Sequence, residues 1–299
     1  MPARHPALAL LTEAVTLWTA RNAFQHAGAL AFYTLFSLAP LTIILITIIG
    51  AVFGEEAARG EISAQIDDLI GGQAAEAVEE AVRRSRPAEA GLLPTIVGGV
   101  ALLFGATTVF AQMQASLNQI FGVVAKPSRS GVVVFLVTRL LSLGLVVIIG
   151  FLLLTSLAIT IAMTALLRFA EDWIPVPSLL VAAVDAAVSL LVAMLLFGTI
   201  FKVLPDVRLR WAQISQGALI TAVLFVVGQY LISLYLTHTA PGSTYGAAGS
   251  LVVLLMWVYY SALILFFGAA ITKVAIIHRG ERIVPKPTAV RMQIAIVEE

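Results

Sequence analysis

The sequence predicts an all-α, polytopic membrane protein with six transmembrane helices, and two observations carry this prediction. The chain of 299 residues is 60% hydrophobic and only 12% charged, whereas soluble domains carry about 25% charged residues. Its apolar residues also fall into six long runs, which lie at 29–53, 92–117, 132–167, 178–201, 212–237 and 246–272. Runs of this length and composition are typical of helices that cross a bilayer.

The third run, 132–167, is the longest and holds one charge, Arg139, and no proline. As a helix it would be about 54 Å long at about 1.5 Å per residue. A hydrocarbon core is about 30 Å thick, so the run can cross once but is too short for two spans and a turn. The first run contains Pro40, which we expect to kink the helix rather than end it, because neighbouring membrane helices can satisfy the freed carbonyl.

The distribution of basic residues predicts that both termini are cytoplasmic. With six spans, the segments on the inner side carry most of the Lys and Arg residues, namely Arg4, Arg21, Lys126, Arg129, Lys202, Arg208, Arg210, Lys273, Arg279, Arg282, Lys286 and Arg291. The outer segments carry only Arg59, Arg83, Arg84, Arg86 and Arg168. This bias follows the positive-inside rule.

The segments outside the spans suggest three further features. Residues 1–28 are expected to form a cytoplasmic or interfacial N-terminal helix with Leu8, Leu11, Val15 and Trp18 on one side. The outer loop 54–91 is expected to form short amphipathic helices that cap the membrane domain, 29–277. The simplest interpretation of the acidic residues in this loop is that they form a face exposed to water. The tail, 278–299, contains Pro285 and Pro287 and is expected to be flexible.

A candidate substrate-binding site follows from Arg139. A charge deep in an apolar run usually faces the protein interior or a water-filled cavity. Amide side chains of the second span and polar groups of the first lie at a similar depth and could surround it: Gln112, Gln114, Asn118, Tyr33 and Ser37. The alternative is that the helix slides outward and Arg139 reaches the inner headgroups with its long side chain.

A second polar layer is expected nearer the outer surface. Asp185 is the other ionisable residue deep in an apolar run, and Gln229 and Tyr230 reach a similar depth in the fifth span. The alternative is that Asp185 lies at the outer interface and is solvated by water. An inner and an outer polar layer would be the minimum that a polar pathway requires.

Enzymatic chemistry finds no support in the sequence. The chain has no cysteine, and its histidines, His5, His26, His238 and His278, show no metal-ligand spacing. Walker, GxSxG and HExxH motifs are absent. We therefore expect no catalytic residues, no metal and no cofactor. The basic residues are too dispersed to indicate nucleic-acid binding and fit membrane topology and contact with anionic lipids better.

Several stretches resemble the YihY/BrkB family of bacterial inner-membrane proteins. They are AGALAFYTLFSLAP at 27–40, FGATTVFAQMQASLNQIF at 104–121, LPDVRLRW at 204–211, QGALI at 216–220 and YGAAGSLVVLLMWVYYSALILFFGAAIT at 245–272. The likeness covers roughly residues 22–275. It implies six spans and an inner-membrane location. Some members carry the name ribonuclease BN, a label that nothing in these residues supports.

The residues and the resemblance together suggest a transporter or flippase-like protein for a lipid or another amphipathic substrate. The expected partners are membrane lipids and an amphipathic or anionic, lipid-like substrate, without nucleic acid, and an oligomer is compatible with the sequence. The competing hypothesis is an envelope protein that scaffolds membrane partners without transport. A membrane ribonuclease is the third and least supported reading.

Overall fold

A computed structural model describes residues 6–54, 92–126, 178–239 and 247–292, with isolated positions between 56 and 80 and between 140 and 155. Within these ranges the helices are α1 (Pro6–Ala20), α2 (Ala23–Phe53), α5 (Leu92–Phe121), α7 (Ser178–Val203), α8 (Trp211–Thr239) and α10 (Ala247–His278). Short strands are β1 (Val123–Ala125), β2 (Val207–Arg208), β3 (Val284–Pro285) and β4 (Ala289–Arg291). The chain is therefore mostly helical, as the sequence predicts.

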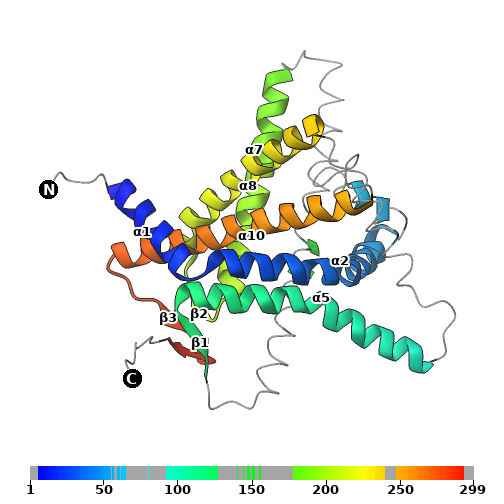
Figure 1. Cartoon of the computed structure of the whole chain (residues 1–299), viewed down its shortest axis with the longest axis horizontal. Coiled ribbons are helices and arrows are strands. Elements are labelled where there is room, and N and C mark those ends of the chain that lie inside the picture. Colours follow the sequence, from blue (N-terminus) through cyan, green and yellow to red (C-terminus); the bar gives the residue numbers. More distant parts are fainter. Residues whose placement is uncertain are drawn as a thin grey trace.

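All four strands lie at one end of the helical bundle, which we call the strand-bearing end (Figure 1). α2 and α8 begin there, whereas α5, α7 and α10 end there. β1 pairs antiparallel with β4, with Val124 opposite Val290, and β2 pairs antiparallel with β3, with Val207 opposite Pro285. Each pair therefore joins a connection between membrane helices to the segment that follows α10.

Among the described residues, three helices are long and apolar enough to cross a membrane, with windows at Ala186–Val203, Trp211–Ile232 and Val252–His278. Only 28% of the α7 window is buried within the protein, and the large side chains Leu191 and Leu231 are more than half exposed. Apolar surface of this extent is costly in water, and lipid would cover it. The membrane class predicted from composition is thus supported by the structure.

Five of the six predicted runs coincide with long helices, α2, α5, α7, α8 and α10. α2 continues unbroken through Pro40. The third run, 132–167, lies largely outside the described residues, although isolated positions such as Gly144 and Phe151 are helical. The outer loop, 54–91, is likewise described only at isolated positions. The number of six spans, the cytoplasmic position of both termini and the cap over the outer surface therefore stay predictions.

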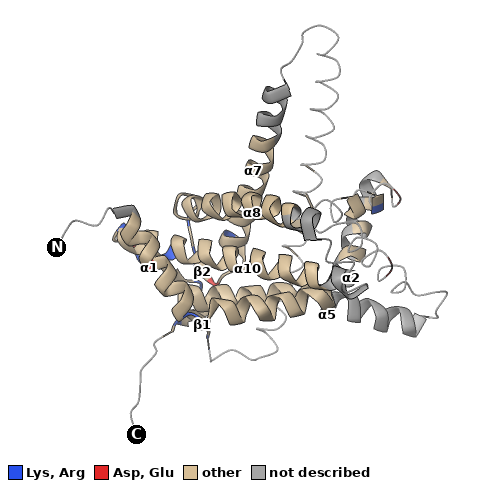
Figure 2. Cartoon of the chain, turned by 45° about the horizontal axis from the view of Figure 1, so that its top comes forward, with Lys and Arg blue, Asp and Glu red and all other residues tan. Residues whose placement is uncertain are grey.

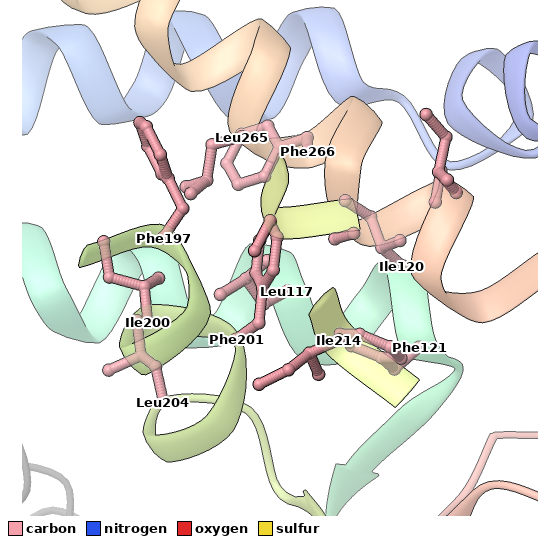
Figure 3. Packing of buried hydrophobic residues seen from close by; sticks show 14 of the residues in the cluster. Leu117, Ile120, Phe121, Phe197, Ile200, Phe201, Leu204, Ile214, Leu265 and Phe266 are labelled. Atoms are coloured by element: carbon pink, nitrogen blue, oxygen red, sulfur yellow. The ribbon is translucent and has the colours of Figure 1, made fainter. Parts of the chain in front are cut away.

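The best-packed part of the described chain is the apolar cluster near the strand-bearing end (Figure 3). Leu117 of α5, Phe201 of α7 and Phe266 of α10 meet there and are fully buried. Ile214 from the first turn of α8 and Ala27 from the first turns of α2 belong to the same cluster. Close packing of these side chains holds the helix ends together, since van der Waals contact drives the association of membrane helices.

α8 and α10 approach each other through small residues. A Cβ atom added at Gly217 would lie 2.0 Å from Thr272 Oγ1, and one added at Gly268 would lie 1.8 Å from Thr221 Oγ1. Both threonine hydroxyls bond to a carbonyl of their own helix, Thr221 to Gly217 and Thr272 to Gly268. The small residues of α8 and α10 therefore form a helix-packing surface, as is typical of membrane helices.

The segment after α10 differs from the flexible tail that the sequence predicts. Gly280 follows the end of α10, and its φ of 71° is the left-handed conformation that glycine adopts readily. The chain then turns back, and residues 284–291 pair as β3 and β4 with the connections after α7 and α5. The prolines do not prevent this, because each strand pairs on one side only, where a missing N–H is tolerated. Residues 293–299 lie outside the described part.

Lys and Arg residues gather at the strand-bearing end, at the helix ends, on the strands and in the turns beside them (Figure 2). The described residues that the sequence assigns to the inner side all lie in or beside these elements: Arg21, Lys126, Lys202, Arg208, Arg210, Lys273, Arg279, Arg282, Lys286 and Arg291. The charge bias along the chain is therefore also a bias in space.

Candidate functional site

The connection between α7 and α8 supplies the central acidic group of the strand-bearing end, Asp206. Pro205 follows the end of α7 and cannot continue the helix hydrogen-bond ladder. The chain then extends as β2 and enters α8 at Trp211, where the N–H of Arg210 donates to Gln213 Oε1 at 2.7 Å. A glutamine at this position satisfies one of the free amides at a helix start. Asp206 is thereby held on a short, fixed turn.

Two amides of α5 bond to Asp206. Asn118 Nδ2 donates to Asp206 Oδ2 at 2.8 Å, and the Asp206 N–H donates to Asn118 Oδ1 at 2.7 Å. Gln114 Nε2 donates to the same carboxylate oxygen at 3.4 Å. Gln114 and Asn118 are four residues apart and therefore share a helix face. The structure thus brings together two of the predicted amides, with Asp206 as their acceptor.

The segment after α10 closes the other side of Asp206. Thr288 Oγ1 donates to Asp206 Oδ1 at 3.4 Å, and the N–H of Lys286 donates to the Asp206 carbonyl at 2.8 Å. Lys286 Nζ donates to the Val203 carbonyl at the end of α7 at 2.9 Å. Burial lowers the pKa of the Lys286 ammonium, and the Asp206 carboxylate opposes that shift. Asp206 therefore joins α5, the α7–α8 turn and the returning tail.

A second polar contact joins α2 to α5. Ser116 Oγ lies 3.2 Å from His26 Nδ1 and donates to the Gln112 carbonyl at 2.9 Å. Gln112 Nε2 donates to Ser116 Oγ at 3.4 Å. His26 Nε2 is buried and has no hydrogen-bond partner among the described residues. Gln112 therefore belongs to the α2 side of α5, on a different face from Gln114 and Asn118.

The two predicted residues of α2 have different environments. The Ser37 side chain is 1% exposed, and its hydroxyl has no partner within the described chain. Tyr33 is 37% exposed, and its ring packs edge-on against Phe32 with centroids 5.9 Å apart. The structure thus places Ser37 inside the bundle and Tyr33 at its surface.

The remaining predicted site residues are placed only in part. Arg139 lies outside the described residues, so its role stays a prediction. Asp185 belongs to α7, but its side chain is likewise outside the described part. Gln229 of α8 is half-buried, and Tyr230 is 71% exposed, so these neighbours point in different directions from the helix.

A third polar cluster fixes the start of α8 to the end of α10. Glu281 accepts hydrogen bonds from Gln213 Nε2 and from Arg210 Nη2, the latter at 2.6 Å. The bonds from Gln213 and Arg210 hold the pKa of the Glu281 carboxyl below its ordinary value. Like the Asp206 network, this cluster joins segments far apart in the sequence.

These groups make polar contacts between helices and the segments that connect them. Ser116, the serine with a histidine beside it, is fully buried, and its hydroxyl bonds to its own helix. The described residues include no group of three His, Asp or Glu side chains that could hold a metal ion. The clusters can bind polar or charged groups and can hold helix ends closed.

The profile of the family described as Virulence factor BrkB matches residues 14–293, almost the whole chain. The chain belongs to the BrkB family. This confirms the resemblance found in the sequence. Similar proteins to this BrkB-family chain include the ribonuclease-like protein YfkH of Bacillus subtilis, 24% identical over 92% of this chain and 98% of its own length.

Two further relatives are named UPF0761 membrane proteins. One is from Pseudoalteromonas translucida, 27% identical over 83% of this chain and 79% of its own. The other is from Mannheimia succiniciproducens, 28% identical over 84% of this chain and 83% of its own. No solved structure matches this BrkB-family chain. Its membrane class thus rests on the family and on its own apolar helices.

Sequence reasoning missed Asp206 as a site residue, although one signal was present. It is the only acid between Lys202 and Arg210, in a turn that also carries Arg208. A carboxylate directly after a proline and among basic residues could have been predicted to contact another part of the chain. Lys286 and Thr288 gave no such signal, because their segment has the composition of a mobile tail.

Proposed function

We propose that this protein is a transporter or flippase-like protein of the bacterial inner membrane that moves a lipid or another amphipathic molecule. The observation that carries the proposal is the presence of polar side chains inside an apolar bundle, at the His26–Ser116–Gln112 contact and at buried Ser37. Polar groups within a membrane domain are costly and commonly mark a pathway. Two of these groups, His26 Nε2 and Ser37 Oγ, are buried without a partner in the described chain.

The pathway we propose opens at the strand-bearing end. The Asp206 network and the apolar cluster around Phe201 hold α5, α7, α8 and the tail together there. The hydrogen bonds of the Asp206 network are of the kind that can be exchanged for water. In our proposal they form the closed state of a gate, and the helix ends part when substrate passes.

Six spans with both termini in the cytoplasm complete the proposal. α5 ends at the strand-bearing end, and α7 begins away from that end, at the top of the view (Figure 1). One crossing by the third apolar run, 132–167, would connect them. The basic residues of the strand-bearing end then face the cytoplasm, as the positive-inside rule requires. Arg139 would line the pathway from that third run.

An amphipathic substrate suits the surfaces that border the bundle. α2 presents Phe32 and Phe36, both more than half exposed, close in sequence to buried Ser37. Acyl chains could contact the aromatic rings while a polar headgroup meets the interior. The basic residues at the strand-bearing end would favour an anionic headgroup.

We also propose that the protein is not an enzyme and needs no cofactor. The ribonuclease-like name belongs to the Bacillus relative, and the polar clusters described above offer no exposed nucleophile beside a base. Purified protein is expected to leave a fluorescent RNA intact, with and without added divalent cations. Cleavage that co-purifies with the chain and disappears in Asp206→Asn or His26→Gln protein would contradict this.

A scaffold that holds membrane partners without transport is the second candidate. It is favoured by the pairing of Gln114 and Asn118 with Asp206, which leaves these amides engaged. The exposed apolar side chains of α7 and α8 could then bind other membrane proteins rather than lipid alone.

Reconstitution distinguishes the two candidates. The full chain would be incorporated into vesicles of phosphatidylcholine and phosphatidylglycerol that carry a trace of headgroup-labelled fluorescent phosphatidylglycerol. A membrane-impermeant reductant bleaches only label in the outer leaflet. We expect the protected fraction to fall below that of protein-free vesicles as the protein content rises. A protected fraction equal to that of protein-free vesicles, for both anionic and zwitterionic labelled lipids, would contradict transport of lipids and favour the scaffold.

A further inference from the structure

Two cationic side chains converge on one glycine at the strand-bearing end. A Cβ atom built on Gly122 would lie 3.3 Å from Lys273 Nζ and 3.8 Å from Arg21 Nη2. Gly122 ends α5 with a φ of 76°, a left-handed conformation that glycine adopts without strain. The missing side chain lets both nitrogens approach the backbone closely at the end of α5.

Neither cation has an acidic partner in the described part of the chain. The ion pairs found there involve Arg210 with Glu281 and His278 with Glu13. Lys273 Nζ donates to the Ile120 carbonyl at 2.8 Å, and Arg21 Nη1 to Met292 Sδ at 3.6 Å. Both groups keep donors to spare after these bonds. Two like charges this close repel each other unless an anion lies between them.

The position of the pair fits the level of lipid headgroups. Arg21 lies in the turn between α1 and α2, and Lys273 lies five residues before the end of α10, about 7.5 Å along the helix axis. α1 beside it exposes Leu8, Leu11 and Val15, as a helix at a membrane surface does. Trp18 anchors α1 to α10 by donating to the Leu263 carbonyl at 3.2 Å.

We propose that Arg21 and Lys273, with Gly122 as the floor between them, form a binding site for a phosphate group. Arginine binds phosphate oxygens through two parallel N–H donors, and lysine adds a point charge. The phosphate would come from an anionic lipid headgroup of the adjoining leaflet or from the free ion. The site is separate from the Asp206 network and does not depend on transport.

The plainer reading is that Lys273 only caps the carbonyl end of α5. A cap would explain its bond to Ile120 but not the approach of Arg21 to the same point. Capping is also satisfied by a neutral donor, whereas phosphate binding requires the charges. Substitution by glutamine, which can still donate to Ile120, therefore separates the two roles.

Thermal unfolding of the purified full chain in a neutral detergent would test the site. Dioleoyl phosphatidylglycerol, dioleoyl phosphatidylcholine and inorganic phosphate would be titrated separately. We expect phosphatidylglycerol to raise Tm of the wild type and phosphatidylcholine to leave it unchanged. In Lys273→Gln and Arg21→Gln proteins the apparent affinity for phosphatidylglycerol should fall at least tenfold. Lys126→Gln and Arg282→Gln remove exposed charges of the same end and should bind like the wild type.

Arg21→Glu is a variant that should still fold, because the new carboxylate can pair with Lys273. We expect it to be stable and to show no Tm response to phosphatidylglycerol. A Tm increase with inorganic phosphate that needs Arg21 and Lys273 would identify the phosphate group itself as the ligand. A response to the lipid alone would identify the headgroup in its membrane setting. Equal responses in site and control variants, or none in the wild type, would overturn the proposal.

Discussion

Asn118 and Asp206 exchange two hydrogen bonds across the strand-bearing end, one from Asn118 Nδ2 to Asp206 Oδ2 and one from the Asp206 N–H to Asn118 Oδ1. The amide of one residue thus satisfies both the backbone and the side chain of the other. Because Thr288 and Lys286 bond to the same aspartate, a single turn holds α5 and the returning tail in place.

Asn118→Ala is expected to lower the free energy of unfolding by about 1–3 kcal/mol, because it leaves the amide of Asp206 and its carboxylate without their main partner. Thermal unfolding in detergent, followed by tryptophan fluorescence, would measure the loss. Gln25→Ala removes an exposed amide from α2 and should change the midpoint little. Equal effects of the two substitutions would mean that the Asn118 contact contributes nothing specific.

Gly268→Ala is expected to disrupt the contact between α8 and α10. The added methyl group would lie 1.8 Å from Thr221 Oγ1 and 3.0 Å from the Gly217 carbonyl, so the helices must separate, at a cost of about 1–3 kcal/mol or more. Gly28→Ala is the matched control, because nothing lies within 4 Å of its Cβ position. Yield of monodisperse protein and the unfolding midpoint would be compared. A Gly268→Ala protein as stable as Gly28→Ala would contradict the packing.

Glu281 should make stability depend on acid pH. Its folded-state pKa is lowered below the ordinary value of a glutamate side chain, 4.5, first by the Gln213 bond and then by Arg210. Such a group contributes stability that is present above about pH 4.5 and lost as pH falls through the lower folded-state pKa. Glu281→Gln should therefore reduce Tm at pH 7 and converge with the wild type at more acid pH. A constant difference between the two proteins across this range would argue against the linkage.

The sequence predicted those parts of the structure that depend on a pattern of residues within one segment. Long apolar runs predicted the five described long helices, because hydrophobicity over some twenty residues needs no partner to be recognised. The similar depth of Gln114 and Asn118 along the second apolar run predicted that their amides lie together, and both bond to Asp206.

Contacts between distant segments could not be predicted in this way. β1 and β4 contain three residues each, too few for an alternating pattern, and their partners are more than 150 residues apart. Asp206 receives its partners from α5 and from the segment after α10, neither of which is marked in its own neighbourhood. The sequence instead directed attention to Arg139, whose isolation in an apolar run is a local feature.

The most direct test of transport through the strand-bearing end is to lock that end reversibly. Ala125 of β1 and Ala289 of β4 lie directly opposite each other, at a position between the bonded pairs Lys126–Thr288 and Gly122–Met292. Opposed residues of this kind have Cα atoms about 4.5 Å apart, within the range that a disulfide spans. The natural chain has no cysteine, so Ala125→Cys with Ala289→Cys adds a single bridge.

Vesicles with the double variant would be assayed for translocation of labelled phosphatidylglycerol, first oxidised and then after reduction. We predict that translocation is slow in the oxidised protein, returns to the wild-type rate on reduction, and is unaffected by oxidation in either single variant. Equal rates in the oxidised and reduced states would show that this end does not open, and rates no higher than in protein-free vesicles throughout would contradict lipid transport itself.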